Sequence, residues 1–275
     1  MEYQNISGES FAVMILMIIL GLVLPILLAF IWTKKTKQPV VPILVGAGVF
    51  FLFAIVLETI PKALLFAANK SLSEYIMSRT WLFIFIVVML AGVFEETGRF
   101  VAFKFWLKKY TDKKTPITYG IGHGGFEAMY LMAVSGVQNL VFAVMIKTGT
   151  FGTIVEQVKN TSPDQLEAVE AIPATLASLT FGMLFFSVLE RMSAVLIHIS
   201  CSVVVFKAVR EKKYIFYFLA VLIHAALDVI AGLYQTKIIT STAVVEILMF
   251  AEALTVFAAV YKLLYKKTEK ENETE

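Results

Sequence analysis

Cysteine is almost absent from this chain, since Cys201 is the only one in 275 residues. A single thiol excludes an intrachain disulfide and any metal site built from several cysteines. Charged residues are also scarce, at 16%, where a soluble domain has about 25%. The net charge of +3 implies no bulk attraction to nucleic acid. These shortages argue against a disulfide-stabilised protein, a soluble domain and a nucleic-acid partner.

Long apolar blocks make up most of the chain. Hydrophobic residues account for 59% of it, and the mean hydropathy is +0.79. A bilayer span needs about 20 mostly apolar residues. We therefore predict an all-α, polytopic transmembrane bundle that forms one domain over residues 1–275 in the cell membrane, most simply a prokaryotic plasma membrane. The predicted spans cover residues 11–32, 40–61, 80–107, 118–146, 174–206, 214–234 and 241–263.

The distribution of basic residues predicts the orientation. Alternate connections and the tail together carry 15 Lys and Arg, and the other connections carry only 6. Because cytoplasmic loops are enriched in Lys and Arg, we expect the N-terminus outside and the C-terminus in the cytoplasm. The longest outer connection, Lys147–Pro173, is acidic. We expect it to be a solvated loop with one short helix, although a segment lying on the membrane surface is an alternative.

Several ionisable residues interrupt the apolar spans. Each costs roughly 2.5–3.5 kcal/mol on insertion scales, so such groups mark function by default. All three histidines of the chain are among them, and none lies in a loop. Span by span, the set is Glu95, Glu96 and Arg99; His123 and Glu127; Glu190, Arg191 and His198; and His224 and Asp228.

Spacing and depth both suggest that these groups meet. His123 and Glu127 are four residues apart, as are His224 and Asp228, so each pair shares one helix face. With a rise of about 1.5 Å per residue, Glu96 and the three histidines lie roughly 7–17 Å from the cytoplasmic edge. We therefore expect one polar cavity, lined by several spans and opening toward the cytoplasm.

Such a cavity could serve several chemical functions. A carboxylate with imidazoles suits general acid–base catalysis on a water molecule. The same groups could hold a metal, with Asp228 or Glu127 orienting a histidine, relay protons, or form purely structural ion pairs. Small residues around His123 fit either close helix packing or a local break in the helix. They are Gly120, Gly122, Gly124 and Gly125.

An ordered set of motifs resembles a known superfamily. The motifs are Glu95-Glu96-Thr97-Gly98-Arg99, His123 within Gly-His-Gly-Gly-Phe-Glu, and His224-Ala-Ala-Leu-Asp228. They resemble the CAAX-protease and bacteriocin-processing (CPBP, or ABI) superfamily of intramembrane proteases. The motif around His123 and the extra His198 are most similar to the YhfC family, which is related to the APH-1 subunit of γ-secretase. The first motif is one residue shorter than the Glu-Glu-x-x-x-Arg of many relatives.

This resemblance implies an intramembrane protease with a catalytic core at about residues 80–234. It implies that Glu95 or Glu96 activates water, that His123 positions it, and that His224 and Asp228 stabilise the oxyanion. Supporting roles then fall to Arg99, Glu127, Arg191 and His198. The expected substrate is a peptide within or beside the bilayer, and a glutamate-type mechanism needs no cofactor. The alternative for the site is Zn²⁺ held by His198, His224 and a carboxylate.

Two other classes of protein remain alternatives. A non-catalytic scaffold of the APH-1 type, or a bacteriocin-immunity protein, would keep membrane histidines without cleaving a substrate. A proton-coupled transporter would show inverted repeats and broken helices in matching halves, and the sequence gives no such repeat.

The two adjacent glutamates need different roles, because neighbouring helical residues point about 100° apart. Glu95 and Arg99 are four residues apart, a good spacing for a helical ion pair. We therefore expect Glu95 to pair with Arg99, and Glu96 to act as the general base.

Overall fold

The protein folds into helices long and apolar enough to cross a membrane. The computed structural model describes residues 5–266, and within that range it contains helices and turns but no strand. Seven of the helical stretches qualify as membrane spans by length and composition, as the sequence predicts. They cover Gly8–Thr36, Val41–Phe66, Thr80–Trp106, Thr115–Lys147, Phe181–Arg210, Ile215–Gln235 and Thr242–Tyr265. The chain is therefore a multi-pass membrane protein.

Three spans are single α-helices and four contain a π-helical stretch. The single helices are α1 (Gly8–Thr36), α11 (Phe181–Arg210) and α12 (Ile215–Gln235). The composite spans are α2 (Val41–Val49) with η1 (Phe50–Leu57) and α3 (Thr59–Phe66); α5 (Thr80–Val101) with η2 (Ala102–Trp106); α6 (Thr115–Ala128) with η3 (Met129–Val134) and α7 (Ser135–Lys147); and α13 (Thr242–Val260) with η5 (Tyr261–Tyr265). Such π-helical insertions are frequent at functional sites.

The connections contain more helix than the sequence predicts. Lys70–Met77 forms α4 between the second and third spans. The outer connection holds α8 (Gly152–Thr161), the short η4 (Pro163–Gln165), α9 (Leu166–Glu170) and α10 (Ile172–Ala177), so the expectation of one short helix is wrong. The fifth span begins at Phe181 rather than 174, because α10 ends at Ala177 as a separate helix.

The chain divides into two compact units, which are described separately. The first consists of the residues up to Leu24 together with Ala128–Val188. Its core contains Met14, Phe151 and Leu176, all nearly inaccessible to solvent. Ser10 Oγ donates to the carbonyls of Ala177 and Leu179, at 3.3 and 3.2 Å, and so ties α1 to the segment after α10.

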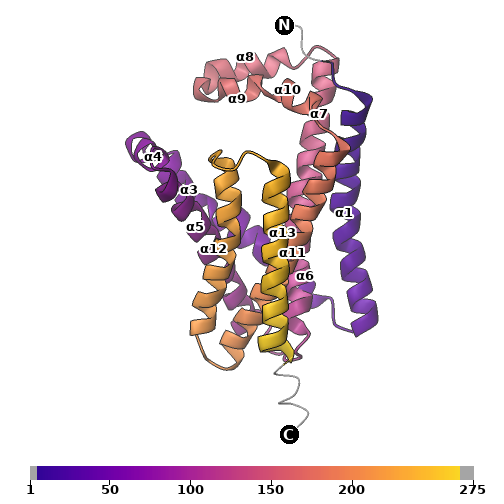
Figure 1. Cartoon of the computed structure of the whole chain (residues 1–275), viewed down its shortest axis with the longest axis vertical. Helices are drawn as coiled ribbons and strands as arrows, with labels where there is room; N and C mark the ends of the chain where they lie inside the picture. The colour runs from indigo at the N-terminus through magenta and orange to yellow at the C-terminus, as the bar shows by residue number, and fades with distance from the viewer. Residues whose placement is uncertain (1–4, 267–275) are drawn as a thin grey trace. The chain divides into compact units, whose positions relative to one another are not determined.

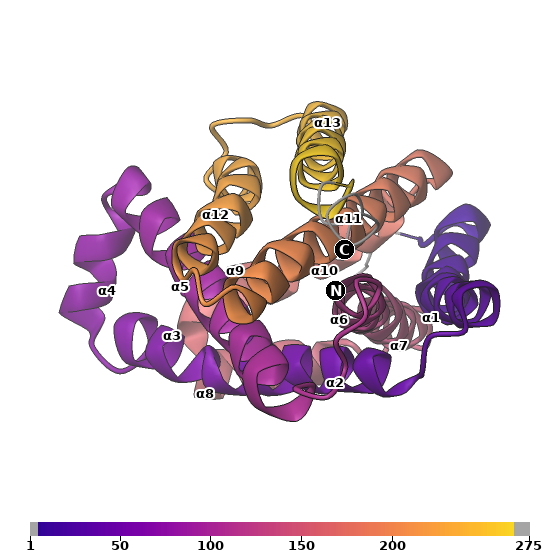
Figure 2. The same ribbon diagram turned by 90° about the horizontal axis from the view of Figure 1, so that it is seen from below.

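The second unit consists of Pro25–Glu127 and the residues from Leu189 onward, and it holds every candidate site residue. In it α12 runs antiparallel to α13 (Figure 1) and packs beside α5 (Figure 2). Glycines place α6 tightly between its neighbours. A Cβ on Gly122 would lie 2.1 Å from the carbonyl oxygen of Ile43 in α2, and one on Gly120 would lie 2.6 Å from the Cα of Ile199 in α11. These glycines therefore serve close packing, and α6 continues unbroken past His123.

The orientation of the chain is tested by reporter fusions. We expect a reporter at Glu275, which lies outside the described residues, to behave as cytoplasmic. A reporter placed between α8 and α9 should behave as external, because the connections on that side of the membrane carry few basic residues. Alkaline phosphatase and fluorescent-protein fusions at each position measure this directly. A reversed pattern at either position would overturn the predicted topology.

Candidate active site

A carboxylate–imidazole pair joins α5 to α6 at the centre of the second unit. His123 Nε2 lies 2.9 Å from Glu95 Oε2, and the imidazole is fully buried. The other ring nitrogen, Nδ1, lies 3.4 Å from the hydroxyl of Tyr119, one helical turn earlier on α6. The ring of Phe50, from η1, contacts the His123 ring edge-on with centroids 5.4 Å apart. His123 is thus held on three sides.

The second glutamate forms a separate cluster. Arg99 donates to Glu96 Oε1 within α5, and both side chains are fully buried. The same oxygen accepts from His224 Nδ1 of α12 at 2.8 Å. The expectation that Arg99 pairs with Glu95 is therefore wrong. Spacings of three and four residues both place side chains on one helix face, so Arg99 can reach either glutamate. It pairs with Glu96, because the Glu95 carboxylate is hydrogen-bonded to His123.

His198 lies between the two clusters. Its Nδ1 accepts from Arg99 Nη2 at 2.9 Å, and its Nε2 donates to Glu127 Oε2 on α6. Arg191, two turns earlier on α11, donates to the other Glu127 oxygen at 2.9 Å and to Glu190 at 2.6 Å. Arg99 of α5 and Glu127 of α6 thus hold both ring nitrogens of His198.

Three of these residues could hold a metal ion. One ligand atom from each of Glu95, His123 and His198 lies within 4.8 Å of the others. The alternative set expected from the sequence paired His198 with His224 instead. His224 Nε2 is 3.9 Å from Glu95 Oε1, so it lies beside this set, and it is not a member among the residues described.

The chemistry of this donor set suits a divalent cation. Two imidazoles and a carboxylate are a common ligand set for catalytic zinc. Metal-binding histidines normally have their second nitrogen held by a hydrogen-bond partner, and here Tyr119 faces His123 and Glu127 accepts from His198. Carboxylates also outnumber guanidinium groups among the charged residues of the site, which leaves negative charge for a cation to offset. Those residues are Glu95, Glu96, Glu127 and Asp228 against Arg99 and Arg191.

The most exposed carboxylates of the site are Asp228 and Glu190. The side chain of Asp228 is 31% exposed and that of Glu190 is 33% exposed. At the end where the lysine-rich connections lie, the site rests on the apolar core of the second unit, whose residues include Phe103, Tyr119 and Val205, all 1% exposed or less. Large apolar side chains thus fill the helix packing at the lysine-rich end of the site, and the direction in which the site opens stays a prediction.

Three residues near the site escaped the sequence reasoning. Tyr119 lies four residues before His123, a spacing that shares its face. Glu58 is buried in the second span and forms an ion pair with Lys62 at 2.6 Å. Glu246 of α13 is 7% exposed, and its Oε2 has no hydrogen-bond partner within residues 5–266. Both glutamates lie inside predicted spans, so counting every intramembrane carboxylate would have found them.

Fold and site together define a polytopic membrane protein with a buried carboxylate–histidine centre shared by four helices. The chain belongs to the YhfC family of intramembrane metalloproteases, whose family model matches residues 20–249. It is also similar to the "Uncharacterized membrane protein YhfC" of Bacillus subtilis (strain 168). The two are 29% identical over 262 residues, which is 95% of this chain and 98% of that protein. No solved structure matches the chain.

Proposed function

We propose that this protein is an endopeptidase that hydrolyses a peptide bond within or beside the membrane. The observation that carries the proposal is the buried set of Glu95, His123 and His198, with His224 directly beside it. Burial of these groups costs free energy and needs a functional reason. Membership of a family described as intramembrane metalloproteases supports the same reaction.

Glu95, His123 and His198 are the residues that would hold a divalent ion, and their chemistry favours Zn²⁺. When bound, such an ion supplies Lewis-acid polarisation of the scissile carbonyl group. The protein supplies the orientation of the ligands. Glu127 holds His198 through Nε2, and Nδ1 lies 4.0 Å from Glu95. In this structure Arg99 Nη2 donates to that Nδ1 at 2.9 Å, so an ion bound there would take the place of this hydrogen bond.

Asp228 is our candidate for the general base. It makes no hydrogen bond to another described residue, and it is the most exposed of the carboxylates in contact with the histidines. Its Oδ2 lies 3.6 Å from His224 Nε2. A carboxylate in this place can accept a proton from water as the water oxygen adds to the peptide carbonyl carbon. It can then return that proton to the leaving nitrogen as the C–N bond breaks.

His224 is our candidate for stabilising the oxyanion. Its Nδ1 is fixed by Glu96, which is itself held by Arg99. This leaves Nε2 facing the space between Glu95 and Asp228, at 3.9 and 3.6 Å. When the ring carries a proton on both nitrogens, Nε2–H is a donor fixed in advance at this point and would stabilise negative charge as it develops on the carbonyl oxygen. We therefore propose Glu96 as a positioning residue, and Asp228 takes the role of general base that the sequence predicts for Glu96.

Asp228→Asn separates catalysis from ligand binding. We expect cleavage of a membrane-peptide library in proteoliposomes to fall by at least about 100-fold, because the amide cannot take the proton. Since Asp228 is not one of the proposed metal ligands, the bound metal should remain unchanged. Cleavage assayed beside elemental analysis of the same sample measures both. Full activity in Asp228→Asn would remove Asp228 from the mechanism.

The exposed end of the site should be where water and substrate enter. By the charge bias of the connections, that end faces the outside of the cell. Cys201 is fully buried and is the only native cysteine, so a Cys201→Ala background allows single-cysteine labelling. We expect Asp228→Cys in that background to react with a membrane-impermeant maleimide on intact cells.

Lys108→Cys, at the lysine-rich end, is the matched control for this labelling. It should react only after the cells are permeabilised, because its connection is predicted to be cytoplasmic. If Asp228→Cys also needs permeabilisation, the proposed direction of access is wrong.

A further inference from the structure

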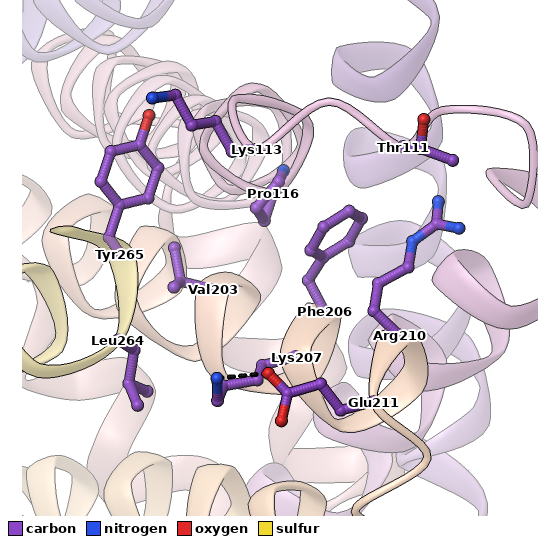
Figure 3. A pocket seen from close by; sticks show the side chains of 10 residues that line it. All are labelled: Thr111, Lys113, Pro116, Val203, Phe206, Lys207, Arg210, Glu211, Leu264 and Tyr265. Carbon is purple, nitrogen blue, oxygen red and sulfur yellow. Dashed lines mark hydrogen bonds and ion pairs between the residues drawn. The ribbon is translucent and has the colours of Figure 1, made fainter. Parts of the chain in front are cut away.

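A pocket lies at the lysine-rich end of the bundle, and its lining contains none of the residues of the carboxylate–histidine site. Figure 3 shows this pocket of about 280 Å³ between the beginning of α6, the end of α11 and η5. Its lining combines basic, aromatic and apolar side chains with one carboxylate, and includes Lys113, Phe206, Lys207, Arg210, Glu211 and Tyr265. A pocket of this composition, at the predicted cytoplasmic edge of the membrane, is suited to an anionic, partly apolar ligand.

Arg210 is fixed at the edge of this pocket by neighbouring groups. Its Nη2 donates to the carbonyls of Tyr110 and Lys108, at 2.7 and 3.3 Å, and its guanidinium group lies over the Phe206 ring, 4.9 Å from the centroid. A guanidinium group held in this way loses little conformational freedom on binding a phosphate, and its geometry matches phosphate oxygens. Arg210 is thus preorganised to bind an anion.

Glu211 opposes anion binding in the same pocket. It forms an ion pair with Lys207, drawn as a dashed line in Figure 3, and a second one with Lys213 at 3.0 Å. Partial burial tends to raise the pKa of the Glu211 carboxyl, but these two lysines outweigh that effect and hold the pKa below its ordinary value. Glu211 is therefore ionised at neutral pH, and an incoming phosphate has to compete with it for Lys207.

The pocket adjoins an apolar groove with a volume of only about 20 Å³. Val203 and Tyr265 line both. The groove lies between α6, α11 and α13, where Ile117, Ile199 and Phe257 form part of its wall. The one serine in its wall, Ser200, donates its hydroxyl to the carbonyl of Leu196 at 2.7 Å and so has its own partner. The groove is too small to enclose an acyl chain, but its apolar wall offers a surface against which one would lie.

We propose that this pocket and groove bind one anionic phospholipid of the cytoplasmic leaflet. Its phosphate would lie against Arg210 and Lys207, and one acyl chain would follow the groove past Val203. Basic pockets between membrane helices on the cytoplasmic side are suited to anionic lipid headgroups. Ile199 of the groove also packs against Gly120, so the lipid would support the α6–α11 contact that carries His123 and His198.

The test measures lipid binding by the purified full chain in detergent, using native mass spectrometry and thermal melting. Phosphatidylglycerol should bind and raise the melting temperature, and phosphatidylcholine should do so much less. Lys207→Gln with Arg210→Gln should weaken binding of phosphatidylglycerol by roughly 30-fold, since each basic residue contributes about 1 kcal/mol. Val203→Phe should weaken it too, by filling the groove without changing any charge.

Two further variants make the test specific. Glu211→Gln should strengthen phosphatidylglycerol binding, because it releases Lys207. Lys34→Gln with Lys35→Gln removes two charges from the same predicted side, outside the pocket, and should change binding little. Equal binding of both lipids would overturn the proposal. An equal loss of phosphatidylglycerol affinity in the Lys34/Lys35 and Lys207/Arg210 double variants would also overturn it. So would weaker phosphatidylglycerol binding by the Glu211→Gln variant. None of these readouts depends on proteolysis.

Discussion

Replacing Glu95 with glutamine should abolish peptide cleavage and bound metal together. The glutamine keeps the shape of the side chain but removes the charge that faces His123 at 2.9 Å and His198 at 4.0 Å. Loss of one ligand of a proposed three-residue set should lower cleavage by at least about 100-fold. The variant should still insert and fold, because Arg99 and His224 depend on Glu96 instead. Cleavage in proteoliposomes and metal content in the same preparation measure the effect.

Glu252→Gln is the matched control, since it makes the same chemical change in another span. Glu252 lies on α13, outside the contacts of the proposed centre, and its substitution should leave cleavage and metal content unchanged. Normal cleavage in Glu95→Gln would remove Glu95 from the site. Loss of cleavage with metal retained would make Glu95 a catalytic group rather than a ligand.

Arg99→Met should destabilise the protein by about 3–5 kcal/mol, because it leaves the buried Glu96 carboxylate without its cationic partner. The guanidinium group is fully buried and also donates to His198. Unfolding in a denaturing detergent, followed by circular dichroism, measures this loss.

A second substitution distinguishes loss of the charge pair from loss of packing. Glu96→Gln combined with Arg99→Met removes both charges, so the double variant should recover much of the stability lost in Arg99→Met alone. If the double variant is as unstable as the single one, the Arg99–Glu96 pair is not the main source of the effect.

The sequence predicts the architecture well because the bilayer imposes a simple rule. A span has to be long and apolar, and that alone identifies the seven membrane helices. The convergence of His123, His198 and His224 also follows from depth, because helical rise fixes how far each lies from a helix end. Their rings indeed lie close together, with centroids 4.6 Å apart between His123 and His198 and 5.4 Å between His198 and His224.

The pairing within the site could not be read from spacing alone. Glu95 and Glu96 are both within one turn of Arg99, and the choice between them depends on which neighbouring helix presents a histidine to each. Similarly, the burial of the lysine-rich end of the site depends on the packing of large side chains such as Phe103 and Tyr119. Such tertiary contacts leave no periodic signal along the chain.

The most direct test of the proposed centre is the metal content of the purified protein compared with that of His123→Asn. His123 is a proposed ligand, and its substitution leaves the Glu96–Arg99–His224 cluster in place. We expect about one divalent ion per chain in the native protein, consistent with a single three-residue site, and almost none in the variant. The absence of a stoichiometric ion from the native protein, or equal amounts in both, would contradict a metal centre at Glu95, His123 and His198.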